Sequence, residues 1–206
     1  MPVTNKIRTL LDAAERAYDA QLSDTDGQAS VTRAFGALKG ALSPREQPPE
    51  RLPTCRHLAQ VADPQAMPAG PLRDVIEAFN AVEPHLRWRK RSGDRTNANA
   101  AFEEDHALSM IVGPGGLVPH DQVYFGVNLQ GPGVRYPDHT HPPEETYLVL
   151  SDGEFSQDGV TWFTPGIGGT FYNPPGILHA MRAGDAPLFA MWVLWRDATQ
   201  AKLATR

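Results

Sequence analysis

Hydrophobic residues recur at one spacing in the first 90 residues and at another beyond about residue 100. In residues 9–22 and again in 31–42, apolar side chains return every three or four positions, as on one face of an amphipathic helix. A third stretch of this kind runs from Pro71 to about Pro84, and proline suits the first turn of a helix because its missing N–H needs no partner there. The sequence therefore predicts three N-terminal helices. Prolines cluster between residues 44 and 71, which predicts a connecting segment over the surface.

Beyond residue 100 the apolar runs shorten to strand length and are separated by Gly, Pro, Asn and Asp. Asp152-Gly153 and Asp158-Gly159 are favoured hairpin-turn pairs, since glycine accepts the positive φ of a tight turn. Short strands separated by frequent turns indicate a β-sandwich or a small barrel. The predicted strands are Ala107–Val112, Gln122–Leu129, Glu145–Leu150, Val160–Phe163, Gly169–Tyr172 and Leu188–Trp195.

These two patterns divide the chain into a helical region, residues 1–100, and a mainly β domain, residues 101–206. We expect the helices to pack on the β domain, because 206 residues lie near the upper end of a single-domain size. The helices could serve as a lid, as the interface of a homodimer or as a cover for one mouth of a barrel. The sequence leaves these alternatives open.

Charge and composition exclude several classes of partner. The formal net charge is −5, and the only dense basic run, Arg87–Arg91, is short, so we expect no nucleic-acid partner. We interpret this run as a solvated helix end, where cations face the negative pole of the helix dipole. Charged residues interrupt the N-terminal 20 residues and no 18-residue apolar run occurs, which predicts neither a signal peptide nor a membrane span. The one cysteine, Cys55, rules out an internal disulfide and fits a cytoplasmic location.

The sequence His139-Thr-His-Pro-Pro-Glu-Glu-Thr-Tyr147 concentrates ionisable side chains at the start of a predicted strand. Alternate residues of a strand share a face, so His139 and His141 belong together, as do Glu145 and Tyr147. Pro142-Pro143 interrupts the strand between the two pairs. If the parity holds across that break, one face carries two imidazoles, a carboxylate and a phenol, while Glu144 faces outward to solvent.

A third histidine, His179, follows the rigid turn Asn173-Pro-Pro-Gly176. Imidazole and carboxylate ligands together suit a divalent Fe, Mn, Co, Ni or Zn ion. Four protein ligands leave open positions on a six-coordinate metal, where a substrate can bind. We therefore predict one divalent transition metal at His139, His141, Glu145 and His179. The other histidines, His57, His85, His106 and His120, are interpreted as structural.

Both histidine segments resemble motifs of the cupin superfamily. Gly133-(five residues)-His139-x-His141-(three residues)-Glu145 is similar to the first cupin motif, and Gly168-(five residues)-Pro174-x-Gly176-(two residues)-His179 to the second. The chain departs from the pattern twice, with seven residues instead of six between Glu145 and Gly153, and with Ala183 at the usual Asn. The resemblance implies a jelly-roll β-barrel, the double-stranded β-helix of cupins, with the metal inside.

The whole arrangement resembles a narrower family, the cupin-type dimethylsulfoniopropionate (DMSP) lyases of the Q type. The shared features are a helical N-terminal part, Tyr136 before the first motif, Tyr147 two residues after Glu145, and His179 downstream. The resemblance implies a carbon–sulfur lyase that cleaves DMSP to dimethyl sulfide and acrylate by β-elimination. The general base implied for this reaction is Tyr147, with Tyr136 as a second candidate or a substrate-positioning group.

Aromatic rings attract a sulfonium cation, which makes Tyr124, Trp192 and Trp195 candidate substrate contacts. Two other classes of function fit the same motifs. An iron dioxygenase of the cupin type would use a similar ligand set, and a non-catalytic cupin would use its barrel only to bind a ligand. Dependence on oxygen separates the dioxygenase from the lyase.

Overall fold

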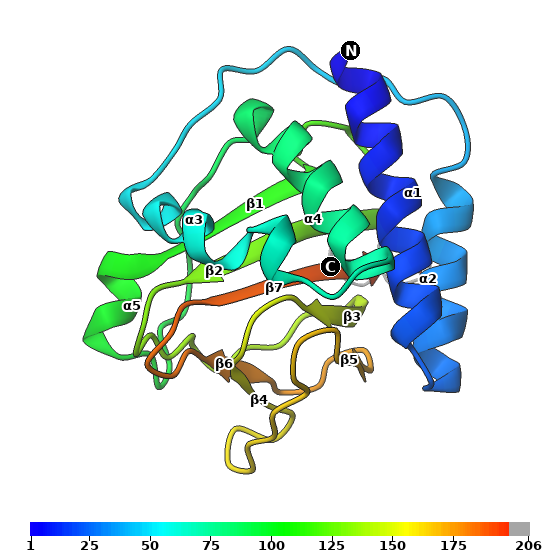
Figure 1. Cartoon of the computed structure of the whole chain (residues 1–206). Helices are drawn as coiled ribbons and strands as arrows, with labels where there is room; N and C mark the ends of the chain where they lie inside the picture. Colours follow the sequence, from blue (N-terminus) through cyan, green and yellow to red (C-terminus); the bar gives the residue numbers. More distant parts are fainter. Residues whose placement is uncertain (198–206) are drawn as a thin grey trace.

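Two antiparallel sheets form the second half of the chain in the computed structural model, which describes residues 1–197 (Figure 1). The larger sheet has the strand order β1-β2-β7-β3-β5, and the smaller pairs β4 with β6. This is the double-stranded β-barrel that the cupin resemblance implies. The strands are β1 (His106–Val112), β2 (Val123–Gln130), β3 (Glu144–Val149), β4 (Glu154–Ser156), β5 (Thr170–Asn173), β6 (Ala180–Arg182) and β7 (Leu188–Trp195).

The three predicted helices are present. Asp24 caps the second by accepting a hydrogen bond from the Gly27 backbone N–H at 2.7 Å, and Pro71 is the first residue of α4. The predicted connecting segment contains short helical turns, and a helix just before β1 was not predicted. The helices are α1 (Val3–Gln21), α2 (Thr25–Ala37), η1 (Pro53–His57), α3 (Leu58–Val61), η2 (Pro64–Ala66), α4 (Pro71–Val82), η3 (Glu83–His85) and α5 (Ala100–Asp105).

Each face of the larger sheet packs against a different layer. Odd-numbered residues of β2 and β7, such as Phe125 and Phe189, pack with α1, α2 and α4 in one core. Even-numbered residues of β7, such as Trp192, face the other way and join residues from β4 and β6 in a second core. The helices therefore cover the outside of the barrel (Figure 1). A cavity lined by residues of both sheets lies on the other face of the larger sheet. Within residues 1–197 no helix is long and apolar enough to cross a membrane.

Five of the six predicted strands are confirmed, but Val160–Phe163 is not a strand. Only Phe163 makes a β-bridge there, to Phe155. The Asp158 carboxylate accepts hydrogen bonds from the backbone N–H groups of Val160 and Thr161 at 2.8 and 2.6 Å. These donors are therefore taken up by a local turn rather than by a neighbouring strand. The short strands β4 and β6 were missed, because three residues are too few to show alternation.

The two predicted hairpin-turn pairs differ in the structure. Gly159 has a φ of +77°, as expected for a tight turn. Gly153 has no positive φ and does not close a hairpin, since β3 and β4 belong to different sheets. Glycine is required at position 153 for a steric reason, because a Cβ there would lie 2.2 Å from Leu188 Cδ1.

The basic run Arg87–Arg91 is not the solvated helix end that its charge pattern predicts. The preceding helical turn η3 ends at His85, and the run continues in extended conformation beside β1, with Arg89 bridged to Leu108. Trp88 is fully buried in the helix-side core. Burial of this ring against α4 fixes the segment at the sheet edge, an effect of tertiary packing that the local charge pattern does not reveal.

Candidate metal site and active-site cavity

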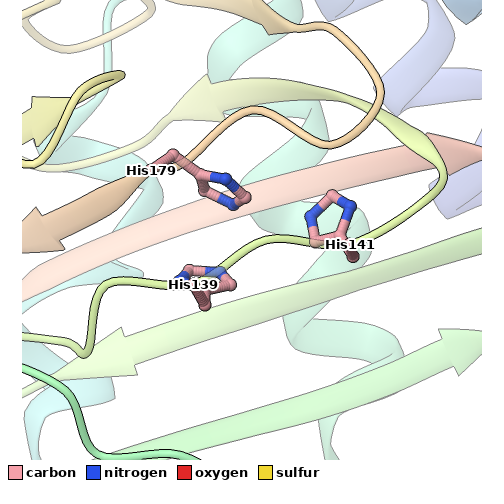
Figure 2. Close-up of side chains that lie close together, drawn as sticks. All are labelled: His139, His141 and His179. Atoms are coloured by element: carbon pink, nitrogen blue, oxygen red, sulfur yellow. The ribbon is translucent and has the colours of Figure 1, made fainter.

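Three histidines converge inside the barrel. His139 and His141 lie on the segment before β3, and His179 immediately precedes β6. An antiparallel bridge joins His139 to His179, with both backbone N–H···O distances at 3.0 Å. One ring nitrogen of each histidine lies within 4.8 Å of the others, and Figure 2 shows the three rings gathered around one space. Residues far apart in the sequence thus form one cluster, as predicted.

Hydrogen bonds orient all three rings in the same way. Each Nδ1 lies 2.8–3.0 Å from a backbone carbonyl oxygen two positions away in the chain. Those carbonyl oxygens can only accept, so each Nδ1 carries a proton and Nε2 is the nitrogen that each ring turns toward the cluster centre. The carbonyl groups belong to Pro137, Pro143 and Ile177. This is the outer hydrogen bond that metal-bound histidines require.

Glu145 completes the donor set. Its side chain is buried, and Oε2 lies 3.2 Å from Nε2 of both His141 and His179. Burial raises the pKa of this carboxyl, but the imidazoles of His141 and His179 outweigh burial and hold it well below its usual value. Asn173 also donates from Nδ2 to Oε2, at 3.4 Å. A carboxylate is therefore present among the three nitrogens.

The donor set fits a metal ion. The Nε2 of buried His179 makes no hydrogen bond within residues 1–197, despite its closeness to Glu145. A buried nitrogen without a partner is costly unless another group binds it. Burial and the adjacent His179 also lower the pKa of His139 to about 3, which keeps its imidazole neutral. Three imidazole nitrogens and one carboxylate form a typical donor set for a divalent transition metal.

A cavity of about 270 Å³ opens beside this cluster. Apolar and aromatic side chains make up most of its wall, which is typical of a site for a small molecule. Tyr124, Tyr136, Tyr147 and Trp192 line it, together with His139, His141 and Glu145. Predicted ligands and predicted catalytic tyrosines therefore share one space.

Known proteins are similar to this chain in sequence and in fold. Residues 26–190 match the family model of the dimethylsulfoniopropionate lyases. The chain belongs to this family. It is 30% identical over 190 residues to the dimethylsulfoniopropionate lyase DddQ of Ruegeria pomeroyi, covering 91% of this chain and 92% of that protein. As a family member, it is a carbon–sulfur lyase.

Two solved structures are similar over nearly the whole chain. A chain from the crystal structures of the DMSP lyases RdDddP and RnDddQII has a TM-score of 0.70 at 26% identity, covering 96% of the lyase described here and 95% of that chain. The crystal structure of DddQ from Ruegeria pomeroyi also gives a TM-score of 0.70, at 24% identity with 94% and 93% coverage. These similarities confirm the expected barrel with N-terminal helices.

The two tyrosines of the lyase lie in different surroundings. Tyr147 stacks on Phe171, with ring centroids 5.0 Å apart, and burial and nearby Glu145 raise its pKa well above the usual value. Tyr136 packs edge-on against Phe102 and lies 5.3 Å from the His139 ring. Burial raises its pKa too. In the absence of a further cation, both side chains are neutral phenols.

The predicted substrate contacts are only partly brought together. Tyr124 and Trp192 line the cavity, but Trp195 packs against the helix-side core on the other face of β7. Strand alternation explains this, since residues 192 and 195 have opposite parity. Gly126 pairs with Trp192 across the sheet, and a Cβ there would lie 2.6 Å from the indole. The glycine therefore makes room for the ring.

Glu144 points away from the cavity, as the alternation predicts, but it is not solvated. Its side chain is buried and pairs with Arg33 of α2 at 2.5 Å. The Tyr172 hydroxyl donates to its other oxygen at 2.7 Å. This carboxylate therefore links α2 to β3 and β5, a contact that the sequence of β3 alone could not show.

Arg91 and Asn128 are polar residues of the cavity wall that the sequence did not point to. Arg91 lines the cavity although it lies in the N-terminal region, where the basic run drew attention only as a surface feature. Asn128 is 2% exposed, donates to Met181 Sδ at 3.0 Å, and its Oδ1 has no partner within residues 1–197. A polar residue within the apolar strand Val123–Gln130 was the available signal.

The remaining histidines lie outside the cluster. His57 pairs with Asp105 at 2.8 Å, and His85 lies 3.1 Å from Lys6 Nζ. His106 and His120 accept hydrogen bonds from backbone N–H groups. These contacts agree with the structural roles expected for them.

Proposed function

We propose that this lyase acts on DMSP by metal-dependent β-elimination and releases dimethyl sulfide and acrylate. The convergence of three Nε2 atoms and the Glu145 carboxylate beside an aromatic-lined cavity is the observation that supports this most strongly. Membership of the family supports the substrate class. His139, His141, Glu145 and His179 would hold the divalent ion, which would act as a Lewis acid toward the substrate carboxylate.

In this proposal Tyr147 is the general base. Its oxygen removes the proton on the carbon next to the carboxylate, and the electron pair of that C–H bond forms the new carbon–carbon double bond. The pair of the breaking C–S bond leaves with neutral dimethyl sulfide. Because the protein alone raises the pKa of Tyr147, the phenolate needs a cation nearby. A divalent ion held by His139, His141, Glu145 and His179 would supply that charge.

Tyr136 is the second candidate for the base. Its ring lies beside that of His139, and its side chain lines the same cavity. Tyr124 and Trp192 form the aromatic wall for the sulfonium group. An aromatic face attracts such a cation by about 0.5–2 kcal/mol. We propose a substrate-binding role for these two rings and none for Trp195.

The decisive experiment measures dimethyl sulfide in the headspace above metal-loaded protein and DMSP, with and without oxygen. We expect equal release in both atmospheres, because no step consumes oxygen. Release only in air would favour the dioxygenase class. No release from protein with full metal occupancy would refute the lyase assignment for this substrate.

Single substitutions separate the two tyrosines. Tyr147→Phe should retain metal and lower kcat by about 10²–10⁴-fold, the usual contribution of a general base. Tyr136→Phe is the matched control, since it removes the same atom from the same cavity and should lower the rate less. If Tyr136→Phe is the more damaging change, the base assignment passes to Tyr136.

A further inference from the structure

The extended segment Arg87–Arg91 forms an additional edge beside β1. Arg89 and Leu108 exchange backbone N–H···O hydrogen bonds of 2.9 Å in both directions. Trp88 points into the helix-side core. By strand alternation, Arg87, Arg89 and Arg91 share the opposite face, which is the cavity side of the sheet.

Of these three arginines, only Arg91 lines the cavity. Its backbone N–H donates to His106 Nε2 at 2.9 Å, and Nη1 donates to the Asp94 carbonyl oxygen at 2.6 Å. The guanidinium carbon lies 5.6 Å from the centre of the Tyr136 ring, whose centre is 5.3 Å from that of His139. Arg91 is thus fixed one aromatic ring away from a candidate metal ligand.

Arg91 makes no ion pair within residues 1–197. Within residues 1–197 no acidic oxygen lies within 4.0 Å of its guanidinium, whereas Arg87 pairs with Glu50 at 2.9 Å. Among the described residues that line the cavity, Arg91 is the only lysine or arginine. The one carboxylate among these residues, Glu145, lies 3.2 Å from the Nε2 atoms of His141 and His179. A half-buried guanidinium therefore lines the cavity with N–H groups that donate to no carboxylate within residues 1–197.

We propose that Arg91 binds the carboxylate of the substrate and so selects and orients it. This inference rests on the proposed function, which supplies a substrate with a carboxylate at one end and a sulfonium at the other. A guanidinium carries several N–H donors in a planar fork, so it can donate to a carboxylate oxygen that a metal at the histidine cluster would leave free. Its charge also disfavours a sulfonium beside it, which directs that end of the substrate to another part of the aromatic wall.

Binding of propionate, a carboxylate that cannot react, tests this role separately from turnover. Ligand-observed NMR of metal-loaded protein should give an affinity that falls about 10- to 100-fold in Arg91→Gln, the effect of losing a hydrogen bond to a charged group. The propionate affinity of Arg91→Lys should lie between those of the wild type and Arg91→Gln, because lysine keeps the charge but lacks the planar fork of donors. Arg89→Gln removes a cation from the same edge outside the cavity and should bind propionate as the wild type does.

Propionamide, which has the same shape without the charge, controls for a merely structural effect. Its affinity should be the same in wild type and Arg91→Gln, with metal occupancy and Tm matched between them. The proposal fails if Arg91→Gln binds propionate normally, if propionate and propionamide weaken equally, or if the wild type binds no propionate. If propionate affinity falls in Arg91→Gln as expected but the wild type releases no dimethyl sulfide from DMSP, only the proposed reaction is refuted.

Discussion

Protonation of His106 should destabilise the fold in mildly acidic solution. Its Nδ1 lies against the Phe102 carbonyl oxygen and must donate, so Nε2 is the acceptor for the Arg91 backbone N–H. A proton on Nε2 would remove that acceptor. Burial, together with the nearby cations Lys90, Arg95 and Arg91, lowers the pKa of His106 to about 4.

The size of the effect follows from the two pKa values. An unfolded chain binds this proton with a pKa of about 6.5, and the folded chain with one of about 4. At about 1.4 kcal/mol per tenfold change in affinity, the full difference is about 3 kcal/mol. Because the unfolded state binds the proton more tightly, stability is complete above about pH 6.5 and is lost as the pH falls toward 4.

Urea unfolding of the wild type and His106→Gln at about pH 7.5 and about pH 4.5 measures this term. Between these conditions the wild type should lose about 2.5 kcal/mol more than the variant, since other ionisable groups are shared by both. The comparison at the higher pH isolates any loss of packing caused by the substitution itself. If the two proteins lose stability in parallel, His106 is not the buried neutral acceptor described above.

Three other perturbations test the site and its support. Gly126→Ala places a Cβ 2.4 Å from the Ser109 carbonyl oxygen and against Trp192. We therefore expect the free energy of unfolding in urea to fall by about 1–3 kcal/mol and the KM to rise. An unchanged KM would contradict the tight fit of Trp192. Tyr18→Phe removes a donor to two strand carbonyl oxygens at 3.1 and 3.3 Å, which should cost about 1 kcal/mol without altering KM. A chelator should abolish dimethyl sulfide release, and an added divalent transition metal should restore it; full activity in metal-free protein would refute the metal requirement.

The sequence predicted the candidate site better than it predicted its surroundings. His139, His141, Glu145 and His179 converge because the two motifs carry both the ligands and the turns that aim them. Most errors arose where contacts between distant segments decide the outcome. One error was local, because Val160–Phe163 has strand-like composition but the Asp158 carboxylate in the same turn accepts hydrogen bonds from two of its backbone N–H groups.

The partners of charged residues also depend on segments that are distant in the chain. Glu144 was expected in solvent because alternation turns it away from the cavity, yet α2 covers that face and supplies Arg33 as its partner. Arg91 was assigned to the surface because nothing in the local run shows that the segment lies beside β1. Trp195 was grouped with Trp192 on composition, and the parity of β7 separates them.

By itself, the sequence determined the type of the long helices and strands, the donor atoms of the candidate metal site and the alternation that sorts residues of one strand between two faces. These properties depend on neighbours within a few positions, where backbone geometry fixes the spacing. Only the tertiary structure decided which face is covered by helices, which charges are paired and which arginine reaches the cavity. Those outcomes depend on contacts between segments that are far apart in the chain, and local spacing carries no information about them.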